Sequence, residues 1–284
     1  MTMRFNLLDE PWLPVRMLSG EVRELGLLAL FEQASQIVAL AETAPPSLMA
    51  QYRLLLAITP DPNTRIQQLK AGACQVALFP RPSDVPALRE HKDLQVLELD
   101  SLLTAYVAIN TRHKPLDDVR VRQAINLAFD RQAYLRAQYG EGNASLAAAP
   151  YPATLLGHDE RLQPWPKDLE RARQLLAEAG HAKGLKLSIW TRPGGGPTNH
   201  NPGIGAQMLQ ADLAAIGIQA DIRVFEWGEL IKRAKNGEHD LVFMGWAGDN
   251  GDPDNFLTPN LSCAAAKSGE NQAGWCHQEF DQLI

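Results

Sequence analysis

Apolar and polar residues alternate with two periodicities along most of the chain, one typical of helices and one typical of strands. After Asp117 or Asp118, which would cap a helix, one face carries Val121, Ala124, Ile125, Ala128 and Phe129. Similar spacing predicts helices over 168–180, 207–216 and 227–235, and apolar alternation or runs predict strands over 185–189, 218–224 and 241–246. Helices and strands therefore alternate from residue 118 onward, which predicts an α/β domain.

Shorter elements are predicted before residue 118. A Ser-Gly pair at 19–20 indicates a hairpin within residues 4–25. Helices are expected over 27–40, 47–56 and 63–71, and strands over 76–79, 96–99 and 105–109. Four prolines between residues 150 and 166 predict a loop in that stretch.

The composition narrows the classes of function. Over 284 residues, 45% hydrophobic and 21% charged residues are values typical of globular proteins, and no apolar run approaches the roughly 20 residues of a membrane span. The net charge of −6 argues against nucleic acid as a partner. The first residues carry no continuous apolar stretch, so the chain as written has no signal peptide and would be cytoplasmic.

Three cysteines leave at least one of them unpaired within the chain. A disulfide between Cys263 and Cys276 would contribute about 3 kcal/mol to stability. Two reduced thiols are the alternative in a cytosolic chain. A zinc site that includes His277 is weaker, because no CxxC pair or fourth ligand is present. We expect no metal and no cofactor, and because hydrolase motifs such as G-x-S-x-G are absent we expect no enzyme.

A loop rich in glycine and aspartate follows the apolar strand at 241–246. In an α/β fold that position suits a small ligand. Calcium is a poor alternative, because Asp249, Asp252 and Asp254 miss the EF-hand spacing. Asp252, Asp254 and Asn255 are expected to build the turn. The three glycines at 194–196 could cradle a phosphate, but no GxxxxGK[ST] motif supports this.

Two segments of the later part of the chain are distinctive, KPLDDVRVRQA at 114–124 and GWAGDNGDPDNF at 245–256, and shorter ones lie at 59–61, 69–72, 110–111, 262–266 and 275–276. Through these segments, residues 59–284 resemble the dipeptide- and oligopeptide-binding proteins of bacterial ABC importers, the family 5 solute-binding proteins. The resemblance implies a disulfide between Cys263 and Cys276, and for Cys74 a partner that this sequence lacks. It also implies that Asp249 binds the ammonium group of a peptide and that Trp246 and Gly248 shape the pocket beside it.

One part of the family pattern is missing. The family places an Arg, and two residues later a Tyr, before the helix at 207–216, where the Arg holds the peptide carboxylate. Gly196 and Thr198 stand at these positions, and Arg192 is a possible substitute. A longer or modified peptide is therefore more plausible than a free dipeptide.

The first 58 residues carry a different set of segments: FNLLDEPWLPV at 5–15, ELGLL at 24–28, AETAPP at 41–46 and QYRLL at 51–55. Through these segments, residues 1–58 resemble the large subunit of the type I-E CRISPR Cascade complex. The change near residue 58 indicates a chimera. The alternative function is accordingly a subunit of a CRISPR effector complex that recognises target DNA.

Together these resemblances imply a partial α/β fold like that of the type II, family 5 periplasmic binding proteins, with a short foreign α+β segment at the N-terminus. Residues 59–101 would be a remnant of lobe one, and residues 102–284 a C-terminally truncated lobe two. The implied function is the substrate-binding component of an ABC peptide importer, impaired in this chain. Its implied partners are a small peptide and a membrane permease, and its implied location is the periplasm.

Overall fold

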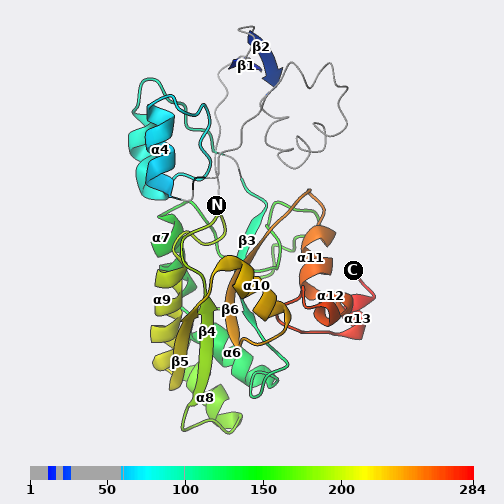
Figure 1. Cartoon of the computed structure of the whole chain (residues 1–284). Coiled ribbons are helices and arrows are strands. Elements are labelled where there is room, and N and C mark those ends of the chain that lie inside the picture. Colours follow the sequence, from blue (N-terminus) through cyan, green and yellow to red (C-terminus); the bar gives the residue numbers. More distant parts are fainter. Residues whose placement is uncertain (1–11, 17–21, 27–58, 60, 99) are drawn as a thin grey trace. The chain divides into compact units, whose positions relative to one another are not determined.

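A computed structural model describes residues 12–16, 22–26, 59, 61–98 and 100–284 (Figure 1). These residues fall into two compact units. Arg81–Ser83 and Asp100–Ile284 form the larger unit, and the remaining described residues form the smaller one.

The described residues of the smaller unit include a hairpin and two helices. Strands β1 (Trp12–Arg16) and β2 (Val22–Gly26) pair antiparallel, as the Ser-Gly turn predicts. Helix α4 (Pro62–Lys70) begins after Asp61, whose carboxylate accepts a hydrogen bond from the Thr64 N–H. Helix α5 (Val85–Arg89) follows a 3₁₀ turn (Pro82–Asp84) whose first two residues belong to the larger unit. The expected helices over 27–40 and 47–56 lie outside the described residues.

Two strands expected in this unit do not form. Residues 76–79 have no strand partner: Val76 and Leu78 are 53% and 42% exposed, and Phe79 has a φ of 55°. A positive φ is incompatible with a strand. In the strand expected over 96–99, residues 96 and 97 are irregular, Glu98 forms a single-residue bridge, and residue 99 lies outside the described residues. An apolar run alone therefore does not establish a strand in either place.

The larger unit is built on a four-stranded sheet in the order β3-β6-β4-β5. The strands span Leu103–Ile109 (β3), Leu185–Thr191 (β4), Ile218–Val224 (β5) and Leu241–Ala247 (β6). Strand β4 lies parallel to β5 and β6, and β3 pairs antiparallel with β6 at the edge. The four predicted strands of this unit therefore form one mixed sheet.

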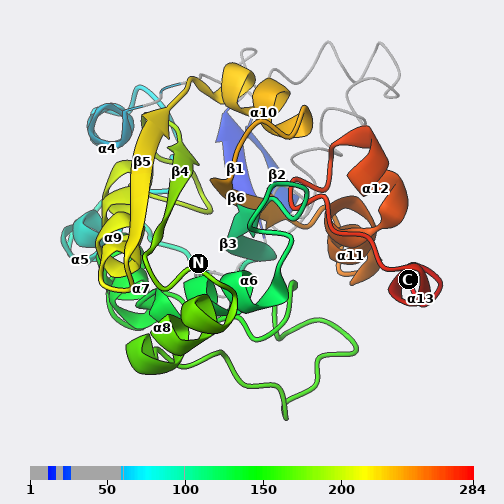
Figure 2. The same cartoon turned by 90° about the horizontal axis from the view of Figure 1, so that it is seen from below.

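Helices cover both faces of this sheet (Figures 1 and 2). One core lies between the sheet and helices α6 (Val119–Ala128), α7 (Arg131–Tyr139), α8 (Leu169–Glu178) and α9 (Pro202–Ala214). The opposite core lies under α10 (Trp227–Lys235). Successive strand residues alternate between the two cores: Ile189 belongs to the first and Trp190 to the second.

Four helices of this unit were not expected. Helix α7 buries Tyr134, Gln138 and Tyr139 instead of an aliphatic stripe, so its pattern is weak. After β6 come the short helices α11 (Asp254–Leu261), α12 (Cys263–Ser268) and α13 (Gln278–Asp281). The described helices are all too short or too polar to cross a bilayer.

Candidate functional site

The connections of the sheet single out one position between β4 and β6. The chain runs from β4 through α9 to β5, and then through α10 on the opposite face to β6, on the other side of β4. Strand order reverses there, and in open α/β sheets ligands bind beyond the carboxyl ends of the strands at such a point. Because β4 ends at Thr191 and β6 at Ala247, the segments 192–201 and 248–255 lie at this edge.

Asn255 organises the segment after β6. Its side-chain oxygen accepts hydrogen bonds from the Trp246 indole N–H (3.3 Å) and from the Asp249 backbone N–H (3.0 Å). Its amide nitrogen lies 3.5 Å from Oδ2 of Asp249. Trp246 is half-buried and Asp249 is exposed. Two of the predicted ligand residues are therefore brought together by a side chain that the sequence assigns to the turn.

Gly248 is required by close packing. Its N–H donates to the Leu102 carbonyl at 2.7 Å, and a Cβ at this position would lie 2.6 Å from Cε2 of Phe256. Phe256 is fully buried, so its ring has little room to move. The absence of a side chain at residue 248 thus lets the loop turn directly over the start of α11.

The neighbouring carboxylates build the turn, as the sequence predicts. Oδ1 of Asp252 accepts a hydrogen bond from the Asp254 N–H at 3.0 Å, and Oδ1 of Asp254 accepts one from the Thr258 hydroxyl. No group of three His, Cys, Asp or Glu side chains suited to a metal ion occurs among the described residues.

The segment after β4 folds into a tight turn. Gly196 and Asn199 exchange backbone hydrogen bonds of 2.8 and 3.2 Å, and the Tyr139 hydroxyl donates to the Thr198 carbonyl at 2.5 Å. A Cβ on Gly245 would lie 2.4 Å from Cβ of Thr198. The Thr198 side chain therefore lies against β6, where only glycine leaves room for it.

Arg192 lies on the other side of the same turn. Its guanidinium carbon stands 4.9 Å from the centre of the Trp227 ring. A Cβ on Gly196 would lie 1.9 Å from Nη2 of Arg192, so the guanidinium occupies the space beside that glycine. Burial lowers the pKa of the Arg192 guanidinium below its ordinary value. No hydrogen bond or ion pair joins Arg192 to Asp249 within the described part of the chain.

Trp227 was not among the candidates from the sequence. It opens α10 and is 48% exposed, and the hydrogen bond from the Phe225 N–H to the Thr191 carbonyl (3.0 Å) holds the end of β5 beside the end of β4. In the sequence Trp227 stands at the start of the helix predicted over 227–235, and nothing in that pattern marks its contact with Arg192.

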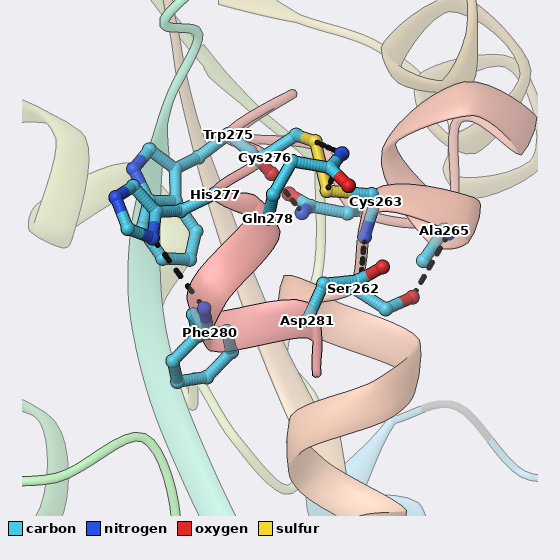
Figure 3. Close-up of a disulfide and its surroundings, with 10 residues drawn as sticks. Ser262, Cys263, Ala265, Trp275, Cys276, His277, Gln278, Phe280 and Asp281 are labelled. Carbon is cyan, nitrogen blue, oxygen red and sulfur yellow. Dashed lines mark hydrogen bonds between the residues drawn. A yellow bond between two sulfur atoms is a disulfide. The ribbon is translucent and has the colours of Figure 1, made fainter. Parts of the chain in front are cut away.

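The C-terminal helices are joined by a disulfide between Cys263 and Cys276 (Figure 3). The Cys263 N–H donates to Oδ1 of Asp281 at 2.6 Å, which ties the start of α12 to α13. Nδ1 of His277 accepts a hydrogen bond from the Phe280 N–H at 3.4 Å and caps α13. Both thiols are in the disulfide and His277 acts as a cap, so this cluster does not form the zinc site considered above. Cys74 is a free thiol.

Two families of known proteins match the chain. Residues 52–268 match the family described as bacterial extracellular solute-binding proteins, family 5 Middle, and residues 6–74 match CRISPR-associated protein Cse1. The two matches overlap over residues 52–74, a stretch that includes the change predicted near residue 58. The resemblance to the family 5 solute-binding proteins is confirmed, and the shorter match at residues 6–74 is consistent with the second resemblance and with the predicted chimera.

Individual relatives match over about four fifths of the chain. Di/tripeptide-binding protein 4 of Pseudomonas aeruginosa (strain UCBPP-PA14) is 62% identical over 81% of this chain and 43% of its own length. The dipeptide-binding protein of Escherichia coli (strain K12) is 42% identical over the same shares. A crystal structure of a dipeptide binding protein from Pseudoalteromonas sp. SM9913 in complex with Met-Leu has a TM-score of 0.73 and 38% identity, covering 80% of this chain and 44% of that one. The chain thus spans less than half the length of these relatives, and the partial α/β fold expected from the sequence is confirmed.

Proposed function

The chain belongs, through residues 52–268, to the family 5 bacterial extracellular solute-binding proteins, and we propose that it is part of the substrate-binding component of an ABC importer for small peptides. The observation that carries this proposal is the Asn255-centred arrangement of Trp246 and Asp249 at the switch point of the sheet. The names of the relatives, which are di/tripeptide- and dipeptide-binding proteins, support the same conclusion.

In this proposal Asp249 binds the ammonium group at the N-terminus of the peptide. Its carboxylate is exposed at the edge where a ligand is expected, and a charge-assisted hydrogen bond to an ammonium is short and directional. Trp246 is held in place by Asn255 and supplies a flat apolar wall, while Gly248 keeps the loop close to α11. Thr198 positions the turn after β4 against β6. These roles are binding roles, and we propose no catalysis.

The 284 residues alone are expected to bind peptide weakly. A small ligand gains affinity when most of its surface is buried, and this chain spans 43% of the length of its di/tripeptide-binding relatives. We assign residues 59–101 to a part of lobe one and residues 102–284 to lobe two. By the same analogy, we propose a periplasmic site of action and a membrane permease as partner.

Titration of the whole chain with trialanine and with N-acetyl-trialanine tests the proposal. We expect saturable binding of trialanine with a Kd of about 1 mM or weaker, close to −4 kcal/mol. Acetylation removes the ammonium, and Asp249→Asn removes the carboxylate charge, so each change is expected to weaken binding about tenfold. Asp221→Asn, at an exposed position in β5, is the matched control and should bind like the wild type. Equal binding of both peptides to all three proteins would contradict the role of Asp249.

A second candidate function rests on the match of residues 6–74 to the Cse1 family. It predicts that the chain co-purifies with the other subunits of a Cascade complex. The net charge of −6 disfavours a nucleic-acid surface. We therefore favour peptide binding over a role in a Cascade complex. Failure of the chain to co-purify with the other Cascade subunits would rule out that second function.

A further inference from the structure

The loop after β6 contains one of the two Asn-Gly pairs in the chain, Asn250–Gly251, and the other pair, Asn236–Gly237, stands at the C-terminal end of α10. An asparagine followed by glycine can lose its side-chain amide without an enzyme, because the next backbone nitrogen reaches the side-chain carbon and forms a cyclic imide. Glycine makes this easiest, since it has no Cβ to crowd the approaching nitrogen. The two pairs share this chemistry, so their surroundings decide which of them reacts.

The Asn250 side chain is held in a position that favours this attack. Its Oδ1 accepts a hydrogen bond from the Asp252 N–H at 3.0 Å, which folds the side chain back along the next two residues. During the attack negative charge develops on this same oxygen, and a backbone N–H already directed at it stabilises that charge. The hydrogen bond therefore both positions the amide and prepares it for reaction.

The attacking nitrogen is also accessible. Asn250 and Gly251 are both exposed, and the Gly251 N–H donates no hydrogen bond within the described residues. The nitrogen attacks only after it has lost its proton, and an exposed N–H of this kind gives its proton to solvent without first breaking a structural bond. A Cβ built on Gly251 would meet no atom within 4 Å, so no neighbouring group of the described chain packs against this position.

Asn236–Gly237 has the opposite surroundings. The Gly237 N–H donates to the Ala234 carbonyl at 2.8 Å at the end of α10, and Gly237 is buried. The Gly237 carbonyl accepts a hydrogen bond from Nδ2 of Asn110 at 2.9 Å. Forming the imide here requires the end of the helix to open first, which costs free energy. The same dipeptide is therefore protected at 236 and accessible at 250.

We propose that Asn250 is a site of spontaneous deamidation and that its products are aspartate and isoaspartate. The Gly251 nitrogen loses its proton and bonds to Cγ of Asn250, and the bond from Cγ to the side-chain nitrogen breaks, so that ammonia leaves. Water then adds to the cyclic imide. Addition at the side-chain carbonyl gives aspartate, and addition at the main-chain carbonyl gives isoaspartate. The net reaction consumes one water and releases one ammonia.

Either product changes the loop to which the proposed function assigns ligand binding. Both products place a new negative charge next to Asp249 in the chain. Isoaspartate also carries the main chain through its own Cβ and Cγ, which lengthens the backbone between Asp249 and Gly251. Deamidation itself does not depend on what the chain binds, because it involves only residues 250 and 251 and water.

Incubation of the folded whole chain in neutral buffer tests the proposal, with digestion, separation of the isomeric peptides and mass spectrometry as the readout. We expect conversion of amide to acid at position 250 to be at least about tenfold faster than at position 236, because the second pair must open before it reacts. Part of the product at position 250 should be isoaspartate, which direct hydrolysis of the side chain does not produce. In denaturant the two pairs should convert at similar rates, because unfolding removes the hydrogen bond that protects Gly237.

Gly251→Ala separates the cyclic route from direct hydrolysis. Its new Cβ has no atom within 4 Å, so the melting temperature should stay close to that of the wild type. The same Cβ crowds the imide, so conversion at position 250 should fall at least about tenfold. Equal rates at positions 236 and 250 in the folded chain would overturn the proposal. So would a product at position 250 without isoaspartate, or a conversion rate that Gly251→Ala leaves unchanged.

Discussion

The disulfide between Cys263 and Cys276 should contribute measurably to stability, and its loop length sets the magnitude. The cysteines are 13 residues apart. In the chain-entropy account, closing a loop of this size in the unfolded chain is worth about 3 kcal/mol at 25 °C. Replacing both cysteines by serine should therefore lower the free energy of unfolding by about 3 kcal/mol, provided that α12 and α13 unfold together with the sheet. The bond from the Cys263 N–H to Asp281 links those helices to each other.

Denaturant unfolding under oxidising conditions, followed by tryptophan fluorescence and by circular dichroism, measures this difference. Cys74→Ser is the matched control, since Cys74 is a free thiol, and it should change stability far less. Adding a reductant should lower the free energy of unfolding of the wild type to that of the double variant. The reductant should leave the stability of the double variant unchanged. An unfolding midpoint that does not respond to the double substitution or to the reductant would refute the reasoning, because the loop would then already be unfolded, or would unfold separately.

Further predictions concern packing and pH, and they extend the binding test of Asp249 given above. Gly248→Ala places a Cβ 2.6 Å from the ring of buried Phe256 and should lower stability by about 1–3 kcal/mol. Gly228→Ala in α10 is the control: its new Cβ has no atom within 4 Å, so this substitution should leave stability unchanged or raise it. Equal melting temperatures for the two variants would contradict the packing argument. Burial lowers the pKa of His239 from 6.5 to about 4. Between pH 6.5 and pH 4 His239 is protonated in the unfolded chain but neutral in the folded one. Its contribution to the free energy of unfolding is therefore largest above about pH 6.5 and should fall by on the order of 3 kcal/mol by pH 4. Unfolding at several pH values should show that His239→Asn flattens this slope while His181→Gln keeps it, and an unchanged slope in His239→Asn would show that other groups cause it.

Much of the fold of the larger unit could be predicted from the sequence, because a helix or strand that buries one face repeats its apolar residues at a fixed spacing. The apolar alternation of β5 and the cap of α6 at Asp118 are local patterns of this kind. The strand expected over 76–79 failed because apolar content does not supply a partner strand, and Phe79 adopts a positive φ. Helix α7 was not predicted because it buries tyrosines and a glutamine instead of a regular aliphatic stripe.

The part of the candidate site that lies in a single segment, the loop after β6, could be predicted from the sequence. The loop after β6 could be assigned because it is rich in Gly and Asp and follows a buried strand. The partnership of Asn255 with Trp246 and Asp249 is also local in sequence, yet only the folded geometry settles which side chain bonds which group. Trp227 comes from a different element, and it lies beside Arg192 only because β5 returns next to β4. Contacts of that kind depend on the tertiary fold and leave no pattern in the chain.

Two-dimensional NMR of the whole chain, titrated with trialanine, can map the backbone amides that the peptide shifts and so locate the peptide site. We expect shifts concentrated at 246–255 and 192–199, the segments that follow β6 and β4, with smaller shifts at the start of α10. Shifts that instead gather elsewhere in the chain, or no shifts at concentrations well above 1 mM, would contradict the assignment of this edge of the sheet as the peptide site.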